Sequence, residues 1–123
     1  MQTKNVKKNV FVIDDDASIG EILKVMLEGE NYNVFSFTTG KMALRFYSQE
    51  KPDLVILDYF LMGENFTDIL NGFKKAGGKN LPIILMSANR EAAGILEKNA
   101  VREFVEKPFQ RETMLKVIAR NIN

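Results

Sequence analysis

The sequence predicts an α/β fold in which five parallel strands form one sheet with helices on both faces. Two observations predict it. Short apolar runs and amphipathic segments alternate strictly along the chain, five times over, and such units form right-handed crossovers between parallel strands. The apolar runs are also continuous, without alternating polar residues, as strands that are buried on both sides require.

The first two strands flank an amphipathic helix. Residues 10–13 form the first apolar run, and residues 32–37 are predicted to be a short second strand. Between them, apolar residues recur at helical spacing, and this face consists of Ile19, Ile22, Leu23, Met26 and Leu27. Asp16 or Ser18 can cap the start of this helix, and Gly29 is expected to end it.

The middle of the chain predicts one helix before the third strand and one after it. A helix over residues 41–49 ends before Pro52, which leads into the apolar strand 54–57. The next helix is closed by Gly77 and Gly78. Its inward face has helical spacing and consists of Phe66, Ile69, Leu70 and Phe73.

Two more strands and two more helices complete the predicted order. Pro82 opens the fourth strand, residues 83–86, and a helix is expected over residues 90–98. The fifth strand is short, residues 104–106, and the last helix covers residues 111–122. The inward residues of these two helices are predicted to be Ala92, Ala93, Ile95 and Leu96, and Met114, Leu115, Ile118 and Ile122.

Composition limits the size and the chemistry of the protein. With 123 residues, the chain is expected to be a single domain, 1–123, whose residues 1–8 form an N-terminal arm. A net charge of +1 gives no electrostatic reason to expect nucleic acid or a membrane surface as a partner. The absence of Cys and His excludes thiolate and imidazole metal sites and a Ser/His/Asp triad. No apolar run approaches the length of a membrane span, so we expect a cytoplasmic protein.

Polar side chains stand at the carboxyl ends of four predicted strands. They are Asp14 and Asp15 after the first strand, Asp58 after the third, Ser87 after the fourth and Lys107 after the fifth. The carboxyl ends of parallel strands meet at one edge of the sheet, where ligands bind. Three carboxylates and one ammonium carry a net charge of −2, which one Mg²⁺ would balance. This pattern predicts phosphoryl transfer, with Asp58 as a nucleophile that forms an acyl phosphate.

Four short motifs contain these strand ends. They are Val12-Ile13-Asp14-Asp15-Asp16, Pro52-Asp53-Leu54-Val55-Ile56-Leu57-Asp58, Leu85-Met86-Ser87-Ala88 and Lys107-Pro108-Phe109. In this order and spacing, the chain resembles the receiver domain of bacterial two-component response regulators, from about residue 10 to residue 122. The resemblance implies a flavodoxin-like receiver fold with the sheet order 2-1-3-4-5.

The resemblance also implies a role for each strand-end residue. Asp58 would accept a phosphoryl group from the phosphohistidine of a sensor histidine kinase or a histidine phosphotransfer protein. The protein would assist its own phosphorylation and dephosphorylation without being a turnover enzyme. Ser87 and Lys107 would stabilise phosphoryl oxygens, and the Lys107–Pro108 peptide bond would be cis. The implied ligands of Mg²⁺ or Mn²⁺ are Asp15, Asp58, the backbone carbonyl of Phe60 and, partly through water, Asp14.

The same resemblance implies a conformational switch. Phosphate on Asp58 would draw the Ser87 hydroxyl inward, and Phe104 would fill the vacated space. This would change the surface of the fourth helix, the fifth strand and the last helix, which a downstream protein, an output domain or a second copy of the chain would contact. The domain itself is expected to contact neither nucleic acid nor membrane. A stand-alone receiver and one domain of a longer regulator both stay open.

The loop after the third strand departs from the family pattern. Where receivers usually carry Pro and then Asp-Gly, this chain has Met62 and then Asn65-Phe66. Gly63 and Asn65 are the candidates for a left-handed backbone conformation here. Phe60 occupies a position that often carries a polar side chain. We hypothesise that its ring shields the acyl phosphate and slows its hydrolysis.

Two alternative functions stay open at this stage. A receiver-like domain that only binds partners, independently of phosphorylation, would have the same fold. The segment Asp14-Asp15-Asp16-Ala17-Ser18 also fits the nucleophile motif of haloacid-dehalogenase-like phosphatases. Those enzymes need a Lys and a later acidic pair, whereas Glu112 is the only acid after Lys107, and Asp58 would have no role.

Overall fold

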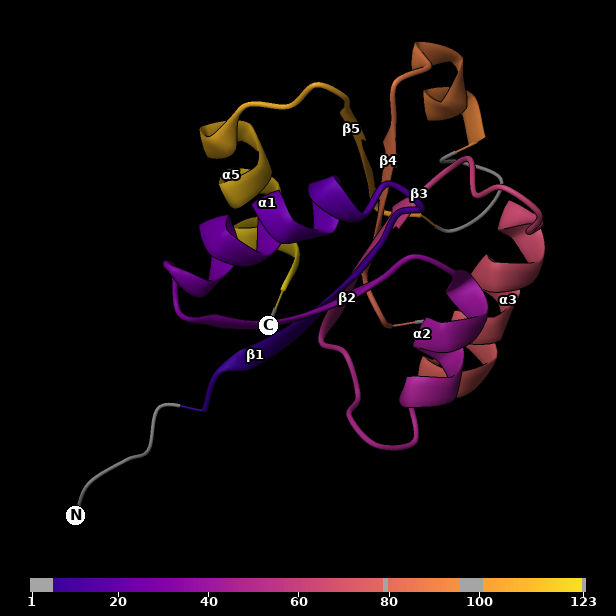
Figure 1. Cartoon of the computed structure of the whole chain (residues 1–123), viewed down its shortest axis with the longest axis horizontal. Coiled ribbons are helices and arrows are strands. Elements are labelled where there is room, and N and C mark those ends of the chain that lie inside the picture. Colours follow the sequence, from indigo (N-terminus) through magenta and orange to yellow (C-terminus); the bar gives the residue numbers. More distant parts are fainter. Residues whose placement is uncertain (1–5, 79, 96–100, 123) are drawn as a thin grey trace.

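Five parallel strands form one sheet in the order β2-β1-β3-β4-β5 (Figure 1). This computed structural model describes residues 6–78, 80–95 and 101–122. The strands are β1 (Lys8–Ile13), β2 (Tyr32–Phe37), β3 (Leu54–Asp58), β4 (Ile83–Ser87) and β5 (Glu103–Glu106). The helices are α1 (Ala17–Glu28), α2 (Gly40–Phe46), α3 (Phe66–Gly77), the 3-10 helix η1 (Arg90–Ile95) and α5 (Arg111–Asn121). The predicted α/β fold class and strand order are confirmed.

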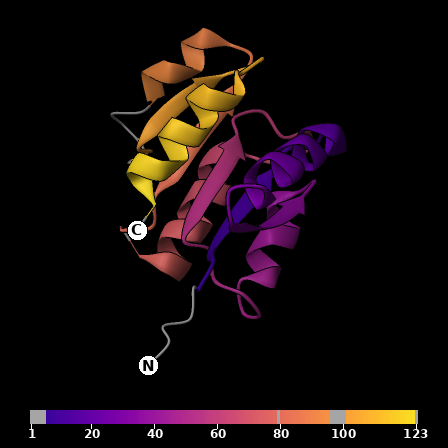
Figure 2. The same cartoon turned by 90° about the vertical axis from the view of Figure 1, so that its left-hand side faces the viewer.

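Helices cover both faces of the sheet, so the core has two halves. Helices α1 and α5 lie on one face, and α2 and α3 lie on the other (Figures 1 and 2). Successive side chains of a strand point to opposite faces. Val10 and Val12 accordingly belong to the half under α1 and α5, while Phe11 and Ile13 belong to the half under α2 and α3. All four are fully buried, which explains why the strands are continuous apolar runs.

An aromatic cluster fills the core half between the sheet and α2. The ring of Phe11 in β1 lies 5.1 Å from that of Phe37, 5.9 Å from that of Phe35, 6.0 Å from that of Phe46 and 6.4 Å from that of Phe73, measured between centroids. Tilted and edge-on pairs at these separations stabilise a core beyond simple burial. The cluster therefore joins α2 and α3 to the two strands β1 and β2.

Side chains cap the first three helices, and the cap of α1 is one that the sequence predicted. Asp16 caps α1, because its carboxylate accepts a hydrogen bond from the Ser18 N–H at 3.0 Å. Thr39 caps α2 through the Met42 N–H at 3.1 Å, and Asn65 caps α3. The predicted helix 41–49 was too long, because α2 ends at Phe46 and the chain continues in turns with i→i−3 hydrogen bonds.

The predicted α-helix over residues 90–98 is wrong in type. The structure has the 3-10 helix η1 there, and the Ala92 N–H donates to the Asn89 carbonyl at 3.0 Å, three residues back. Gly94 in this short segment weakens α-helix formation. Ala92 is buried and Ala93 half-buried, as predicted, but residues 96–98 lie outside the described residues.

The last helix has the predicted inward residues and two more buried residues, Val117 and Asn121. Met114 and Ile118 are fully buried, and Leu115 and Ile122 pack partly against the same core half. The prediction missed both Val117 and Asn121. Across the described ranges, no helix is long and apolar enough to cross a membrane.

Candidate functional site

The carboxyl ends of the strands meet at one edge of the sheet, in the upper part of Figure 1. A pocket of about 370 Å³ opens there, and Asp15, Asp58, Ser87 and Lys107 line it together with residues of the loops after β3 and β4. Asp14 is buried directly behind it, and its carboxylate contacts Lys107. The structure therefore brings together all five strand-end residues that the sequence singled out.

Three carboxylates form a compact acidic cluster in this pocket. One oxygen from each of Asp14, Asp15 and Asp58 lies within 4.8 Å of the others. Asp14 and Asp58 are only 2% and 5% exposed, whereas Asp15 is exposed. Like charges at this separation repel one another, and a divalent cation with oxygen ligands relieves the repulsion. The donor set fits Mg²⁺ or Mn²⁺, and Phe60, whose carbonyl is a further candidate ligand, lines the same pocket.

Lys107 bridges the two buried carboxylates. Its Nζ lies 2.7 Å from Oδ2 of Asp14 and 3.2 Å from Oδ1 of Asp58. Burial disfavours the ammonium, but its contacts with Asp14 and Asp58 outweigh burial and raise the pKa of Lys107. The Lys107–Pro108 peptide bond is cis, as the resemblance implied. Lys107 is therefore a fixed positive charge at the wall of the pocket.

The negative charge of the Asp58 carboxylate is poorly compensated in the folded protein. Burial and the charge of Asp14 raise the pKa of Asp58 to about 6, although Lys107 partly opposes them. A carboxylate whose charge is poorly compensated gains free energy when a cation or an electrophile takes up that charge. Asp58 thus combines access to the pocket with a chemical reason to react.

Ser87 and Phe104 lie on neighbouring strands. Ser87 is buried, and its Oγ accepts a hydrogen bond from the Asn89 N–H at 3.0 Å. Phe104 pairs in register with Leu85 in β4, is half-buried and packs against the core half under α2 and α3. The structure shows a single arrangement of Ser87 and Phe104, the two residues of the predicted switch. The switching itself therefore stays a prediction. Phe60 as a whole residue is 69% exposed.

The loop after β3 contains contacts that the sequence did not reveal. The Met62 N–H donates to Oδ2 of Asp15 at 3.1 Å. The carboxylate of Glu64 accepts hydrogen bonds from the Gly40 N–H at 2.7 Å and from the Lys41 N–H at 3.0 Å. Gly63 has the left-handed conformation, with φ of 78°, whereas Asn65 has φ of −95°. The departures from the family pattern at Met62, Asn65 and Phe66 drew attention to this loop. No sequence signal indicated the partners of Glu64.

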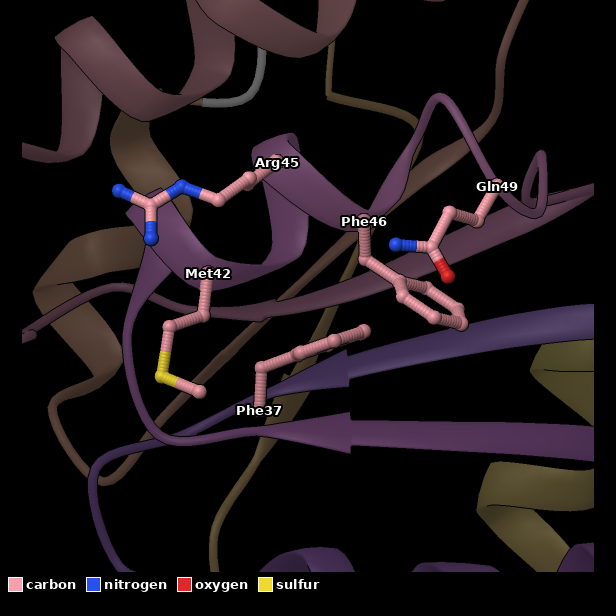
Figure 3. A pocket seen from close by; sticks show the side chains of 5 residues that line it. All are labelled: Phe37, Met42, Arg45, Phe46 and Gln49. Carbon is pink, nitrogen blue, oxygen red and sulfur yellow. The ribbon is translucent and has the colours of Figure 1, made fainter.

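A second pocket, of about 180 Å³, lies between α2 and the edge strand β2 (Figure 3). The side chains of Phe37, Met42 and Phe46 form its apolar wall, and Arg45 and Gln49 stand at its rim. Among the described residues that line it, none carries a carboxylate or a hydroxyl group. Asp15, Asp58, Ser87 and Lys107, to which the sequence analysis assigned phosphoryl transfer, line the first pocket instead.

Comparison with known proteins agrees with this geometry. Residues 10–119 match the family model of the response regulator receiver domain. The chain belongs to this family. The DNA-binding response regulator MtrA of Mycobacterium leprae is 32% identical over 119 residues, which cover 94% of this chain and 52% of that protein. The transcriptional regulatory protein KdpE of Mycobacterium tuberculosis is 32% identical over 108 residues, 86% of this chain and 47% of that protein. The chain thus spans about half the length of these curated relatives.

Solved structures show the same receiver architecture. The response regulator TrrA of Thermotoga maritima, determined in complex with Mg²⁺-BeF, has 29% identity and a TM-score of 0.83, and the match covers 94% of this chain and 99% of that one. The chemotaxis protein CheY4 of Vibrio cholerae has a TM-score of 0.86 at 22% identity, with 95% and 100% covered, and supports the fold alone. The predicted family, the receiver domain of response regulators, is therefore confirmed.

Proposed function

We propose that the protein is a phosphorylation-controlled switch in which Asp58 accepts a phosphoryl group from the phosphohistidine of a partner. The partner is a sensor histidine kinase or a histidine phosphotransfer protein. The observation that carries the proposal is the position of Asp58, buried at a strand end between the carboxylates of Asp14 and Asp15 and the ammonium of Lys107. The absence of His from the chain is consistent with an external donor.

The transfer step needs little covalent chemistry from the protein. A carboxylate oxygen of Asp58 forms a bond to phosphorus, the bond from phosphorus to the imidazole nitrogen breaks, and the imidazole keeps that electron pair. Nζ of Lys107 already lies 3.2 Å from Oδ1 of Asp58. Its ammonium can therefore contact a phosphoryl oxygen once the phosphoryl group is bound to Asp58. The Ser87 oxygen accepts from the Asn89 N–H, and its O–H can donate a hydrogen bond to another phosphoryl oxygen.

In this proposal Asp15, Asp58 and the backbone carbonyl of Phe60 would hold Mg²⁺ or Mn²⁺, with Asp14 acting partly through water. The cation would supply charge neutralisation for the acidic cluster and for the oxygens of the transferred group. The mutual approach of the three carboxylates within 4.8 Å supports this role. The related response regulator TrrA was determined in complex with Mg²⁺-BeF, which supports this role independently.

The output of the switch is a change of surface in this proposal. The phosphoryl group draws Ser87 inward, Phe104 fills the space, and the surface around η1, β5 and α5 changes. A downstream protein, an output domain or a second copy of the chain binds the altered surface. Residues 1–123 act as a single receiver domain in this proposal, although Lys8, expected in the N-terminal arm 1–8, belongs to β1 and pairs with Tyr32. The DNA-binding relatives favour a transcriptional output domain as the downstream element.

Phosphorylation of the purified chain tests the proposal. The protein is incubated with acetyl phosphate and Mg²⁺, and its intact mass is compared with that of Asp58→Asn and of Asp16→Asn. Asp16→Asn is the matched control, because Asp16 lies beside the site but caps α1. We expect one added phosphoryl group in the unsubstituted protein and in Asp16→Asn, and none in Asp58→Asn. No labelling of any variant, or turnover of a generic phosphoester, would contradict the proposal and favour a binding module or a phosphatase, respectively.

A further inference from the structure

The loop between β3 and α3 is attached to the rest of the molecule at three points. The side chain of Leu61 is buried, only 3% exposed. The Met62 N–H donates to Asp15, and the Glu64 carboxylate is bound to the start of α2. A short loop with three such attachments has little freedom, so a change at one point affects the others.

Glu64 forms the strongest of these attachments. Its two carboxylate oxygens accept from two consecutive backbone groups, the N–H of Gly40 at 2.7 Å and the N–H of Lys41 at 3.0 Å. The first N–H groups of a helix have no partner within the helix, and a carboxylate there also interacts well with the helix dipole. Charge-assisted hydrogen bonds are about twice as strong as neutral ones. The loop is therefore firmly anchored to α2, 24 residues away in sequence.

This anchor lies within two residues of the contact with Asp15. The Glu64 N–H donates to the Leu61 carbonyl at 3.1 Å and closes a turn. Gly63 allows this turn, because its φ of 78° suits a residue without a side chain. Met62 lies inside the turn, and its N–H donates to Oδ2 of Asp15 at 3.1 Å. The position of Glu64 thus sets the position of the group that holds Asp15.

Asp15 is the exposed member of the acidic cluster. An exposed carboxylate on a short side chain can rotate, and ordering it for a metal costs entropy. The hydrogen bond from Met62 fixes one of its oxygens and thereby directs the other. Groups that orient metal ligands in this way typically change metal affinity by about 10- to 100-fold when they are removed.

We propose that Glu64 is a positioning residue of the metal site. By holding the loop against the start of α2, it keeps the Met62 N–H on Asp15 and so orients that carboxylate for the cation. The inference rests on the proposed binding of Mg²⁺ to Asp14, Asp15 and Asp58. In this proposal the first turn of α2, which binds Glu64, also influences the orientation of Asp15.

A merely structural role for Glu64 predicts a different result, and Thr39 offers the matched control. Thr39 caps the same helix through the Met42 N–H at 3.1 Å, but the structure gives it no hydrogen bond to the loop. Thr39→Ala therefore weakens α2 and leaves the loop attached. Glu64→Ala removes both hydrogen bonds to α2, and Glu64→Gln keeps the shape while removing the charge and one acceptor.

Mg²⁺ titration of the whole chain, followed by amide NMR shifts and by calorimetry, tests the proposal. We expect the Mg²⁺ dissociation constant to rise about three- to tenfold in Glu64→Ala, less in Glu64→Gln and less than about twofold in Thr39→Ala. Hydrogen exchange of the Met62 amide should accelerate in both Glu64 variants. An unchanged Mg²⁺ affinity in Glu64→Ala and Glu64→Gln would overturn the inference alone. Absence of Mg²⁺ binding by the unsubstituted protein would overturn the proposed metal site and the inference with it.

Discussion

Replacing Asp58 with Asn should stabilise the metal-free protein, and the size of the effect depends on pH. Burial and Asp14 raise the pKa of Asp58 from 3.8 to about 6 in the folded protein. The folded state therefore holds this proton to a higher pH than the unfolded chain does. The stability associated with the protonated group is complete below 3.8 and is lost as the pH rises through about 6.

The magnitude follows from this difference in pKa. One pKa unit corresponds to about 1.4 kcal/mol, so the charged form of Asp58 costs the folded state up to about 3 kcal/mol near pH 8 and about half of that near pH 5. Asn has the same shape and no charge. Asp58→Asn should therefore raise the free energy of unfolding by up to about 3 kcal/mol near pH 8.

Urea denaturation in the presence of EDTA measures this effect. The free energies of unfolding of the unsubstituted protein and of Asp58→Asn are compared at several values of pH. Glu21→Gln is the matched control, because Glu21 is an exposed acid on α1 and its replacement should change stability little at any pH. Equal stability of Asp58→Asn and the unsubstituted protein near pH 8 would refute the reasoning, since it would mean that Asp58 carries no net electrostatic cost.

Three further outcomes follow from the contacts described. Lys107→Met leaves Asp14 and Asp58 without their shared cation, and urea denaturation near pH 8 in EDTA should show a loss of about 2 kcal/mol; stability equal to that of the unsubstituted protein would contradict it. Phe60→Asn should shorten the lifetime of the phosphorylated protein severalfold, followed by loss of label with time, whereas an unchanged lifetime would exclude shielding by the ring. Phe11→Ala should lower the free energy of unfolding by about 3–5 kcal/mol, because Phe11 contacts four other rings; a loss below about 1 kcal/mol would contradict its central place in the core.

The predictions succeeded where local pattern and tertiary structure agree. Continuous apolar strands are stable only in a sheet that helices cover on both faces. Strands β3 and β4 are accordingly buried along their whole length. Helix ends were predictable where a capping side chain is present, as at Asp16. The predicted end of α2 was wrong, because no capping side chain marks the end at Phe46. The predicted type of η1 was wrong, because the local sequence alone does not decide between a 3-10 helix and an α-helix.

The sequence by itself determined the chemistry of the site. The placement of Asp14, Asp15, Asp58, Ser87 and Lys107 directly after apolar strands is sufficient to bring them to one edge of the sheet, because all parallel strands end there. Only the tertiary structure decided how these groups are held. The hydrogen bonds of Met62 and of Glu64 use backbone N–H groups, and nearly every residue carries such a group. Which one meets a given carboxylate depends on the folded path of the chain.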